Sequence, residues 1–163
     1  MIEEQLFEKY LLSVYRFLNF RLRSEKEIRD NLKKKNARDD IIEKIVIRLK
    51  EQKFLNDENF ARLWVDSRSR VKPRSQFLLK MELKQKGISD EIIEKVLQRV
   101  ENEGQSDDVQ ARALVEKNIK KYSGMQKQEL YQKLGGVLAR KGFNWNVTKK
   151  AIDDVLNEEY NAR

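Results

Sequence analysis

Paired aspartates are the residues of this chain whose type and spacing could do chemistry. Asp39-Asp40, Asp107-Asp108 and Asp153-Asp154 could offer oxygen ligands to a metal ion or a pair of carboxylates for acid–base catalysis. Neighbouring positions on a helix point in different directions, so the two members of a pair do not converge. The first two pairs stand at expected helix starts, where carboxylates cap, and the third is expected to face solvent. We therefore predict no metal site.

The other residue types that catalysis requires are missing. The sequence contains no histidine and no cysteine, which removes the usual general base, the common nucleophile pairs, disulfides and thiolate metal sites. Gly135-Gly136 lies inside a helical pattern, which predicts a close helix contact and not a phosphate-binding loop. The sequence predicts no enzyme and no cofactor.

Basic side chains are the second candidate set, and they indicate binding. The net charge of +8 suggests an acidic partner, either nucleic acid or a protein surface, without choosing between them. The stretch RSRVKPR at 68–74, around the single proline Pro73, is expected to join two helices. The candidate partner-binding residues are Arg68, Arg70, Lys72, Arg74, Lys120, Lys121, Arg140, Lys141, Lys149, Lys150 and Trp145.

Within that stretch we expect the arginines to contribute more than Lys72, because a guanidinium matches carboxylate and phosphate geometry. The alternative is that Arg68 pairs with an acid such as Asp66, or one in the preceding repeat, and holds helices together. Trp64 falls on an apolar stripe and is expected in the core. Trp145 stands at a helix start, where either burial or exposure is compatible with the pattern.

The elements that must position these side chains are helices. One proline and six glycines among 163 residues, with 38% charged and 39% hydrophobic residues, are typical of an all-α protein. No apolar run approaches the roughly 20 residues that cross a bilayer, and the acidic start Met1–Glu4 does not resemble a signal peptide. We expect a soluble, cytoplasmic monomer without membrane contact.

An internal repeat organises the helices. DDIIEKIV (39–46) returns as DEIIEKVL (90–97), and RSEKEIRDNLKKKN (23–36) aligns with RSQFLLKMELKQKG (74–87) at the same offset. Both pairs carry apolar residues at helical spacing. Ser24 with Glu27 forms a capping-box signature, and Asn36 and Gly87 suit left-handed helix ends.

A weaker third copy completes the chain, since SDDVQARALVEKN (106–118) resembles NDENFARLWVDSR (56–68) and LARKG (138–142) matches LKQKG (83–87). Extra residues are expected near 122–128. The sequence thus predicts an all-α fold of three tandem three-helix modules, 1–53, 54–104 and 105–163, forming an elongated, curved array. Ile45 and Val96 occupy equivalent positions and are both expected to be buried.

With the modules aligned, the sequence resembles the RecX family of recombination regulators. The resemblance is carried by FLNDENFARLWVDSR (54–68), KPRS (72–75), LKQKGISDEIIEKVL (83–97) and LRSEKEIRDNL (22–32). It weakens beyond residue 100, where it rests on Ala111, Leu138, Gly142 and the final helix. Ser75 and Asn36 stand where the family commonly has glycine.

The resemblance implies a bacterial protein of DNA repair and the SOS response that lies in the groove of the RecA nucleoprotein filament. Such a protein would restrain strand exchange, filament growth, ATPase and coprotease activities. Two other classes stay open from the residues. One is a helical-repeat protein that binds DNA directly through its basic surface, and the other is an adaptor for an unrelated complex.

Overall fold

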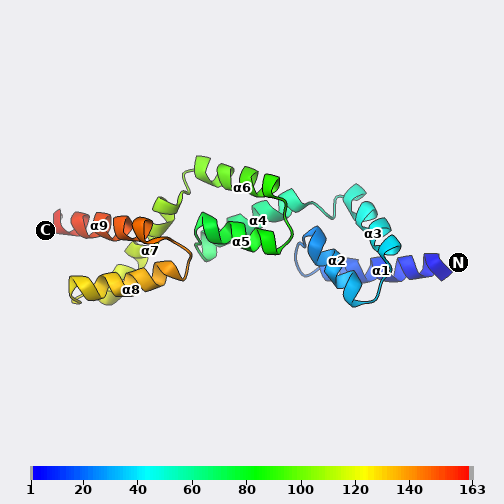
Figure 1. Cartoon of the computed structure of the whole chain (residues 1–163), viewed down its shortest axis with the longest axis horizontal. Helices are drawn as coiled ribbons and strands as arrows, with labels where there is room; N and C mark the ends of the chain where they lie inside the picture. The colour runs from blue at the N-terminus through cyan, green and yellow to red at the C-terminus, as the bar shows by residue number, and fades with distance from the viewer. Residues whose placement is uncertain (1, 162–163) are drawn as a thin grey trace. The chain divides into compact units, whose positions relative to one another are not determined.

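The computed structural model describes the backbone of residues 2–161 and the side chains of residues 3–158. This part of the chain is helical throughout, with no strand, which confirms the all-α class (Figure 1). In chain order the elements are α1 (Ile2–Leu18), α2 (Glu25–Lys34), α3 (Asp39–Glu51), α4 (Asp57–Val71), α5 (Gln76–Gln85), α6 (Asp90–Asn102), α7 (Asp107–Ile119), the 3-10 turn η1 (Lys120–Tyr122), α8 (Lys127–Ala139) and α9 (Trp145–Asn161).

The helices follow the predicted repeat of three. The first helix, expected over about 4–20, is α1, and the helix expected from Asp57 to about Val71 is α4. The extra residues of the third copy form η1 and the turn after it. No helix among residues 2–161 has the length and apolar character needed to cross a membrane. The module boundaries at 53/54 and 104/105 stay a prediction.

Two compact units divide the described chain. One comprises Met1–Leu63 with Leu83–Ile93, and the other comprises Trp64–Glu82 with Glu94–Arg163. Both units contain segments of α4, α5 and α6, so neither unit coincides with one module. Each unit holds a complete three-helix group, α1 to α3 in the first and α7 to α9 in the second.

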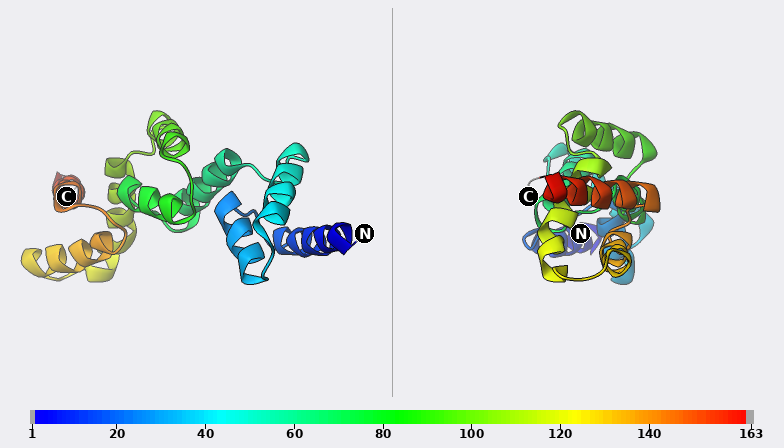
Figure 2. Two further views of the ribbon diagram at one scale, coloured as in Figure 1. Left: turned by 45° about the vertical axis from the view of Figure 1, so that its right-hand side comes forward. Right: turned by 90° about the vertical axis from the view of Figure 1, so that its left-hand side faces the viewer.

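The core of the first unit lies among α1, α2 and α3 (Figure 2). Their apolar residues recur at helical spacing, so each helix presents one stripe to the other two. The buried members are Leu11, Val14, Ile28, Leu32, Ile41, Ile42, Ile45, Val46, Leu49 and Leu55. These contacts orient the start of α2, which carries much of the polar chemistry described below.

The core of the second unit lies among α7, α8 and α9 (Figure 2). It buries Ala111, Leu114, Val115, Ile119, Leu130, Leu134, Leu138, Phe143, Ala151, Ile152 and Val155. A Cβ added to Gly135 would lie 3.3 Å from the Trp145 ring, which confirms the close contact of α8 with a neighbouring helix. Glycine at this position makes room for an indole.

The repeat register is correct at its tested positions. Ile45 of α3 and Val96 of α6 are both buried, as expected for equivalent core residues. Asn36 ends the α2 turn with φ of 60°, and Gly87 and Gly142 follow α5 and α8 with φ of 76° and 86°. The left-handed helix ends predicted at Asn36 and Gly87 are therefore confirmed, and Gly142 shows the same conformation in the third copy.

Two of the three aspartate pairs differ from the prediction in their capping or exposure. Asp39 and Asp40 lie in the first turn of α3 but make no side-chain cap, because the N-cap position is Arg38. Their charges still favour the positive end of the helix dipole. Asp153 was predicted to face solvent, but it is half-buried and accepts hydrogen bonds from Tyr131 and Lys149.

Candidate partner-binding surface

The basic stretch 68–74 covers the end of α4 and the link to α5. Arg68 and Arg70 belong to the last turn of α4, which ends at Val71. Pro73 restricts Lys72 to extended conformations, so the helix cannot continue through this point. The prediction of a basic joint between two helices is confirmed.

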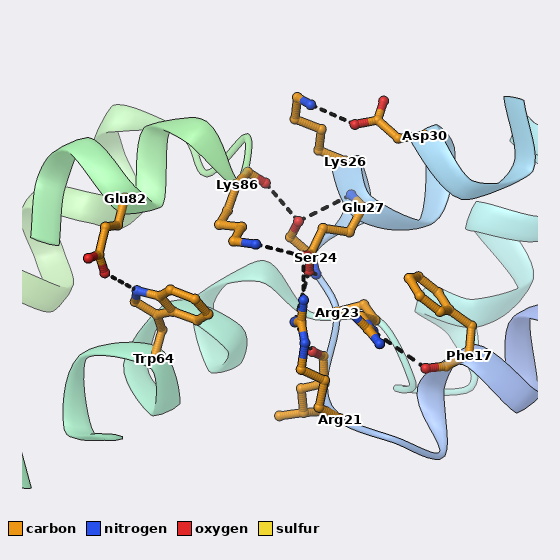
Figure 3. A network of polar contacts seen from close by, with 11 residues as sticks. Phe17, Arg21, Arg23, Ser24, Lys26, Glu27, Asp30, Trp64, Glu82 and Lys86 are labelled. Carbon is orange, nitrogen blue, oxygen red and sulfur yellow. Dashed lines mark hydrogen bonds and ion pairs between the residues drawn. The ribbon is translucent and has the colours of Figure 1, made fainter. Parts of the chain in front are cut away.

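Arg68 and Arg74 both turn inward to Glu82 of α5. Arg68 Nε lies 3.4 Å from Glu82 Oε2 and Arg74 Nε lies 3.0 Å from Oε1, as ion pairs without aligned hydrogen bonds. Trp64 Nε1 donates to the same carboxylate at 2.8 Å (Figure 3), and the Arg68 guanidinium stacks over the Trp64 ring at 4.5 Å. These four side chains hold α4 to α5.

This arrangement corrects two expectations about the stretch. The acid that Arg68 meets is Glu82, whereas Asp66 pairs with Arg99 at 2.6 Å. Trp64 is half-buried and makes a polar contact, so it is a helix-to-helix contact and not a fully buried core residue. The sequence indicated that Arg68 could have a structural role, but not which acid would bind it.

Arg70 and Lys72 are the basic residues of the stretch that remain available. Both are exposed, and neither forms an ion pair within the described part of the chain. The nearest acid along α5 is Glu82, which already carries two arginines and an indole. A partner carboxylate or phosphate would therefore meet two uncompensated cations.

The basic candidates of the third repeat fall into two groups. Lys120, Lys121 and Arg140 are exposed, and only Lys121 makes a side-chain contact within residues 3–158, to Asn118 Oδ1 at 3.3 Å. Lys149 and Lys150 instead bind Asp153 and Asp108 at 2.7 Å and 2.9 Å. Exposed pairs of this kind are weak, so both lysines can exchange their partner.

Trp145 is exposed over 55% of its surface at the start of α9. Its ring lies beside that of Tyr131, with centroids 6.4 Å apart and the two planes tilted by 57°. Burial and the neighbouring Asp153 raise the pKa of Tyr131 to about 12, so its hydroxyl stays protonated and donates to that carboxylate. Trp145 is thus an exposed aromatic side chain with one aromatic neighbour, and its part in partner binding stays a prediction.

Two acidic residues, Asp57 and the Asp107 of an aspartate pair, connect helix starts in a way that the sequence did not predict. Asp57 Oδ1 accepts the backbone N–H of Glu25 at 2.8 Å, and Asp107 Oδ1 accepts that of Gln76 at 2.8 Å. The two contacts are equivalent in the repeat, each joining the first helix of one copy to the second helix of the copy before. Burial raises the pKa of Asp57 and of Asp107, against the opposing effect of these hydrogen bonds.

The same helix starts meet a backbone carbonyl from the following repeat. Ser24 Oγ donates to Lys86 O at 2.7 Å, and Ser75 N donates to Lys141 O at 2.9 Å. Lys141 was a candidate for its side chain, but its carbonyl has this structural role. Matching residues therefore meet in both joints, although Ser24 donates through its hydroxyl and Ser75 through its backbone N–H.

Glu27 is the most strongly perturbed acid of the first joint. The capping box of Ser24 with Glu27 is present as predicted, and Glu27 also binds Arg21 at 2.6 Å and Lys86 at 2.9 Å (Figure 3). Partial burial raises the pKa of Glu27, but hydrogen bonds from Arg21, Lys86 and Ser24 outweigh it and lower the pKa to about 2. The sequence predicted one of these three partnerships.

We expect Glu27→Gln to destabilise the protein by about 1–2 kcal/mol at pH 7, less than the full shift because solvent screens the exposed cation. Because the pKa of Glu27 is lower in the folded state, its carboxylate stabilises the folded protein at pH values above the unfolded pKa of 4.5. This stabilisation is lost as the pH falls towards the folded pKa of about 2. Urea unfolding of wild type and of Glu27→Gln at about pH 7 and pH 3 measures the difference in stability. The difference should shrink at the lower pH, and an equal difference at both would contradict the assignment.

The described side chains include charged and aromatic groups that suit binding. No group of three acidic residues among them is placed to hold a metal ion. The available features are uncompensated cations, one supported indole and exposed apolar side chains on a helical repeat. The fold is that of an all-helical repeat protein, and it carries exposed basic side chains.

Comparison with known proteins identifies the family. Three family descriptions match in order: the first three-helix domain of RecX over residues 11–49, the second over 56–97 and the third over 106–152. A Regulatory protein RecX from Bacillus subtilis (strain 168) is 36% identical over 142 residues, which are 87% of this chain and 53% of the relative. One from Clostridium perfringens (strain 13 / Type A) is 31% identical over 160 residues, 98% of this chain and 74% of the relative.

Solved structures agree with the sequence comparison. The crystal structure of RecX from Lactobacillus salivarius superposes with a TM-score of 0.76 at 26% identity, covering 91% of this chain and 95% of that one. A second crystal structure of a regulatory protein RecX, 24% identical, shares the fold with a TM-score of 0.74 over 90% of this chain and 73% of that one. The chain belongs to the RecX family. It spans about half the length, 53%, of the first Bacillus relatives it matches.

Proposed function

We propose that this protein binds the RecA–DNA filament along its groove and mostly inhibits the recombinase, ATPase and coprotease activities, without catalysis of its own. The observation that carries the proposal is membership of a family of regulatory proteins through all three domains. A filament presents the same surface at regular intervals, and a helical repeat can contact several of these surfaces.

The positive charges of Arg70 and Lys72 support the proposal. They are exposed and uncompensated within the described residues, so binding an acidic partner breaks no internal ion pair. Lys120, Lys121 and Arg140 offer further contacts of the same kind. The other proposed candidates, Arg68 and Arg74, contribute indirectly by holding the end of α4.

The test is a titration of the protein into RecA engaged in ATP hydrolysis or strand exchange. We expect inhibition at substoichiometric protein, because a protein lying across several subunits acts on more than one of them. Unchanged rates at every ratio would refute the proposal and favour an adaptor for an unrelated complex.

Direct binding to DNA is the second candidate function, and the net charge of +8 supports it. Binding through phosphates falls by about 10³–10⁵ between 50 and 200 mM salt when six to ten phosphates are contacted. Affinity for bare duplex at these two salt concentrations separates the candidates. Tight, sequence-specific binding to naked DNA would replace the filament proposal.

A further inference from the structure

Aromatic and basic side chains gather on the hairpin that α8 and α9 form in the second unit, where the two helices lie side by side (Figure 1). Positions four residues apart share one face of a helix. Three such positions on α8 and three on α9 make up what we call the hairpin cluster: Lys127, Tyr131 and Gly135, with Trp145, Lys149 and Asp153.

Contacts between side chains join the two helix faces of the hairpin cluster. The Trp145 and Tyr131 ring centroids are 6.4 Å apart, and the Tyr131 hydroxyl donates a hydrogen bond to Asp153. Lys149 Nζ lies 2.7 Å from the same carboxylate. Lys127 Nζ lies 5.9 Å from the centroid of the Tyr131 ring. These side chains therefore belong to one surface of one unit.

The indole of Trp145 is the part of this surface that a ligand can cover. It is 55% exposed and takes no part in the buried core of α7 to α9. Gly135 lies beside it, since a Cβ at that residue would come within 3.3 Å of the indole Cζ3. The ring is thus positioned by its neighbours and still open to solvent.

The charges of the hairpin cluster favour an anionic ligand. Hydrogen bonds from Lys149 and Tyr131 hold the pKa of Asp153 below its usual range, and the charge of Lys127 acts in the same direction. Two exposed ammonium groups against one carboxylate leave one positive charge beside the indole. An exposed ion pair such as Lys149 with Asp153 is weak, so a phosphate can recruit both lysines.

We propose that the hairpin cluster binds single-stranded nucleic acid, with one base stacked on Trp145 and the adjacent phosphates held by Lys127 and Lys149. An aromatic surface flanked by cations is the combination that binds single strands without sequence preference. A duplex is disfavoured because its stacked neighbours cover the face of each base. An amphipathic helix is disfavoured because it needs apolar anchors at helical spacing, whereas the residue four positions after Trp145 is Lys149.

The first experiment measures binding of a labelled oligodeoxythymidylate by fluorescence anisotropy. We expect Trp145→Ala and Trp145→Leu to weaken binding by about 5- to 150-fold, the loss of one stacked base, and Trp145→Phe to retain most of the affinity. Phe54→Ala is the matched control, because Phe54 is 52% exposed and lies beside the ring of Tyr15 but outside the hairpin cluster. It should leave the affinity unchanged.

The lysines are tested through the salt dependence of the same binding. Each phosphate contact to a single strand contributes about 0.7 to the slope of log affinity against log salt concentration, so Lys127→Gln with Lys149→Gln should lower the slope by about 1.4. Lys26→Gln is the control, because Lys26 with Asp30 forms the same kind of exposed ion pair as Lys149 with Asp153, at 2.6 Å and 2.7 Å. It should leave the slope unchanged.

A second experiment uses wild type and needs no variant to fold. An oligonucleotide with the same phosphates but abasic sugars should bind about 5- to 150-fold more weakly than the thymidylate, because no base stacks on the indole. The inference goes beyond the proposed function and is tested apart from it. Strand binding without inhibition of RecA would refute only the proposed function, and inhibition without strand binding would refute only the inference.

Further outcomes would contradict a stacking site at Trp145. One is equal affinity of wild type and Trp145→Ala for the thymidylate, and another is equal affinity of wild type for the thymidylate and the abasic strand. Equal wild-type affinity for the strand and its duplex would show that no base reaches the indole. Displacement of the labelled strand by polyglutamate as effectively as by unlabelled thymidylate would make an acidic protein surface the ligand.

Discussion

Gly142→Ala should lower the free energy of unfolding by about 2–5 kcal/mol, whereas Gly124→Ala should cost only about 1–2 kcal/mol. Both glycines have φ of 86°, so each substitution carries the same left-handed backbone penalty of about 1–2 kcal/mol. A Cβ at residue 142 would lie 2.5 Å from Ser75 Oγ and 2.8 Å from Leu78 Cβ, which adds about 1–3 kcal/mol of overpacking. Around residue 124 nothing lies within 4 Å.

The other joint offers the same experiment at a second φ. Gly87 and Gly104 both have φ of 76°. A Cβ at residue 87 would lie 2.5 Å from Lys26 Cβ, whereas a Cβ at residue 104 would have no atom within 4 Å. Denaturant unfolding of the four alanine variants measures the differences. Equal costs within each pair would show that the joints are not tightly packed.

Ile45→Asp is expected to destabilise the protein by several kcal/mol, in the range of about 4–5, enough to unfold a domain of ordinary stability. Ile45 is completely buried in the core of α1 to α3, and an aspartate there would be an unpaired charge in an apolar interface. Val96→Asp should act in the same way, since Val96 is buried at the equivalent position.

The matched control lies two residues further along α3. Ile47 is 55% exposed, so Ile47→Asp makes the same chemical change on the solvent side and should alter stability by about 0.5 kcal/mol or less. Thermal unfolding of the three variants is the measurement. Normal stability of Ile45→Asp or Val96→Asp would contradict the observed core and the repeat register.

Local patterns predicted the helices because their causes are local. The Ser24 to Glu27 capping box, the apolar spacing around Ile45 and the left-handed residue Asn36 each depend on neighbours within a few positions. The second and third repeats could then be placed by comparison with the first. No long-range contact was needed for any of these predictions.

Contacts between helices were harder to predict, because they depend on crossing geometry and on which rotamers meet. Arg68 could have paired with several acids, and only the packing of α4 on α5 selects Glu82. Asp57 looks like an ordinary first-turn acid, yet it accepts the N–H of Glu25 from another helix. The repeat itself held a usable signal, since Asp57 and Asp107 are equivalent and make equivalent contacts.

Only the structure shows which basic residues of the stretch 68–74 form internal ion pairs and which are exposed. As sequence, RSRVKPR shows four similar cations, and we ranked its arginines above Lys72. The structure separates Arg68 and Arg74, which bind Glu82 and have only 25% of each side chain exposed, from Arg70 and Lys72 at the surface. This changes the variant with which binding should be tested.

The most direct test of the account is the affinity for the RecA–DNA filament of wild type and of the Arg70→Glu/Lys72→Glu double variant. We predict that wild type binds and that the double variant binds at least about tenfold more weakly with an unchanged melting temperature, because neither side chain pairs with an acid in the described structure. Absence of wild-type binding, or equal affinity of the two proteins, would contradict the account.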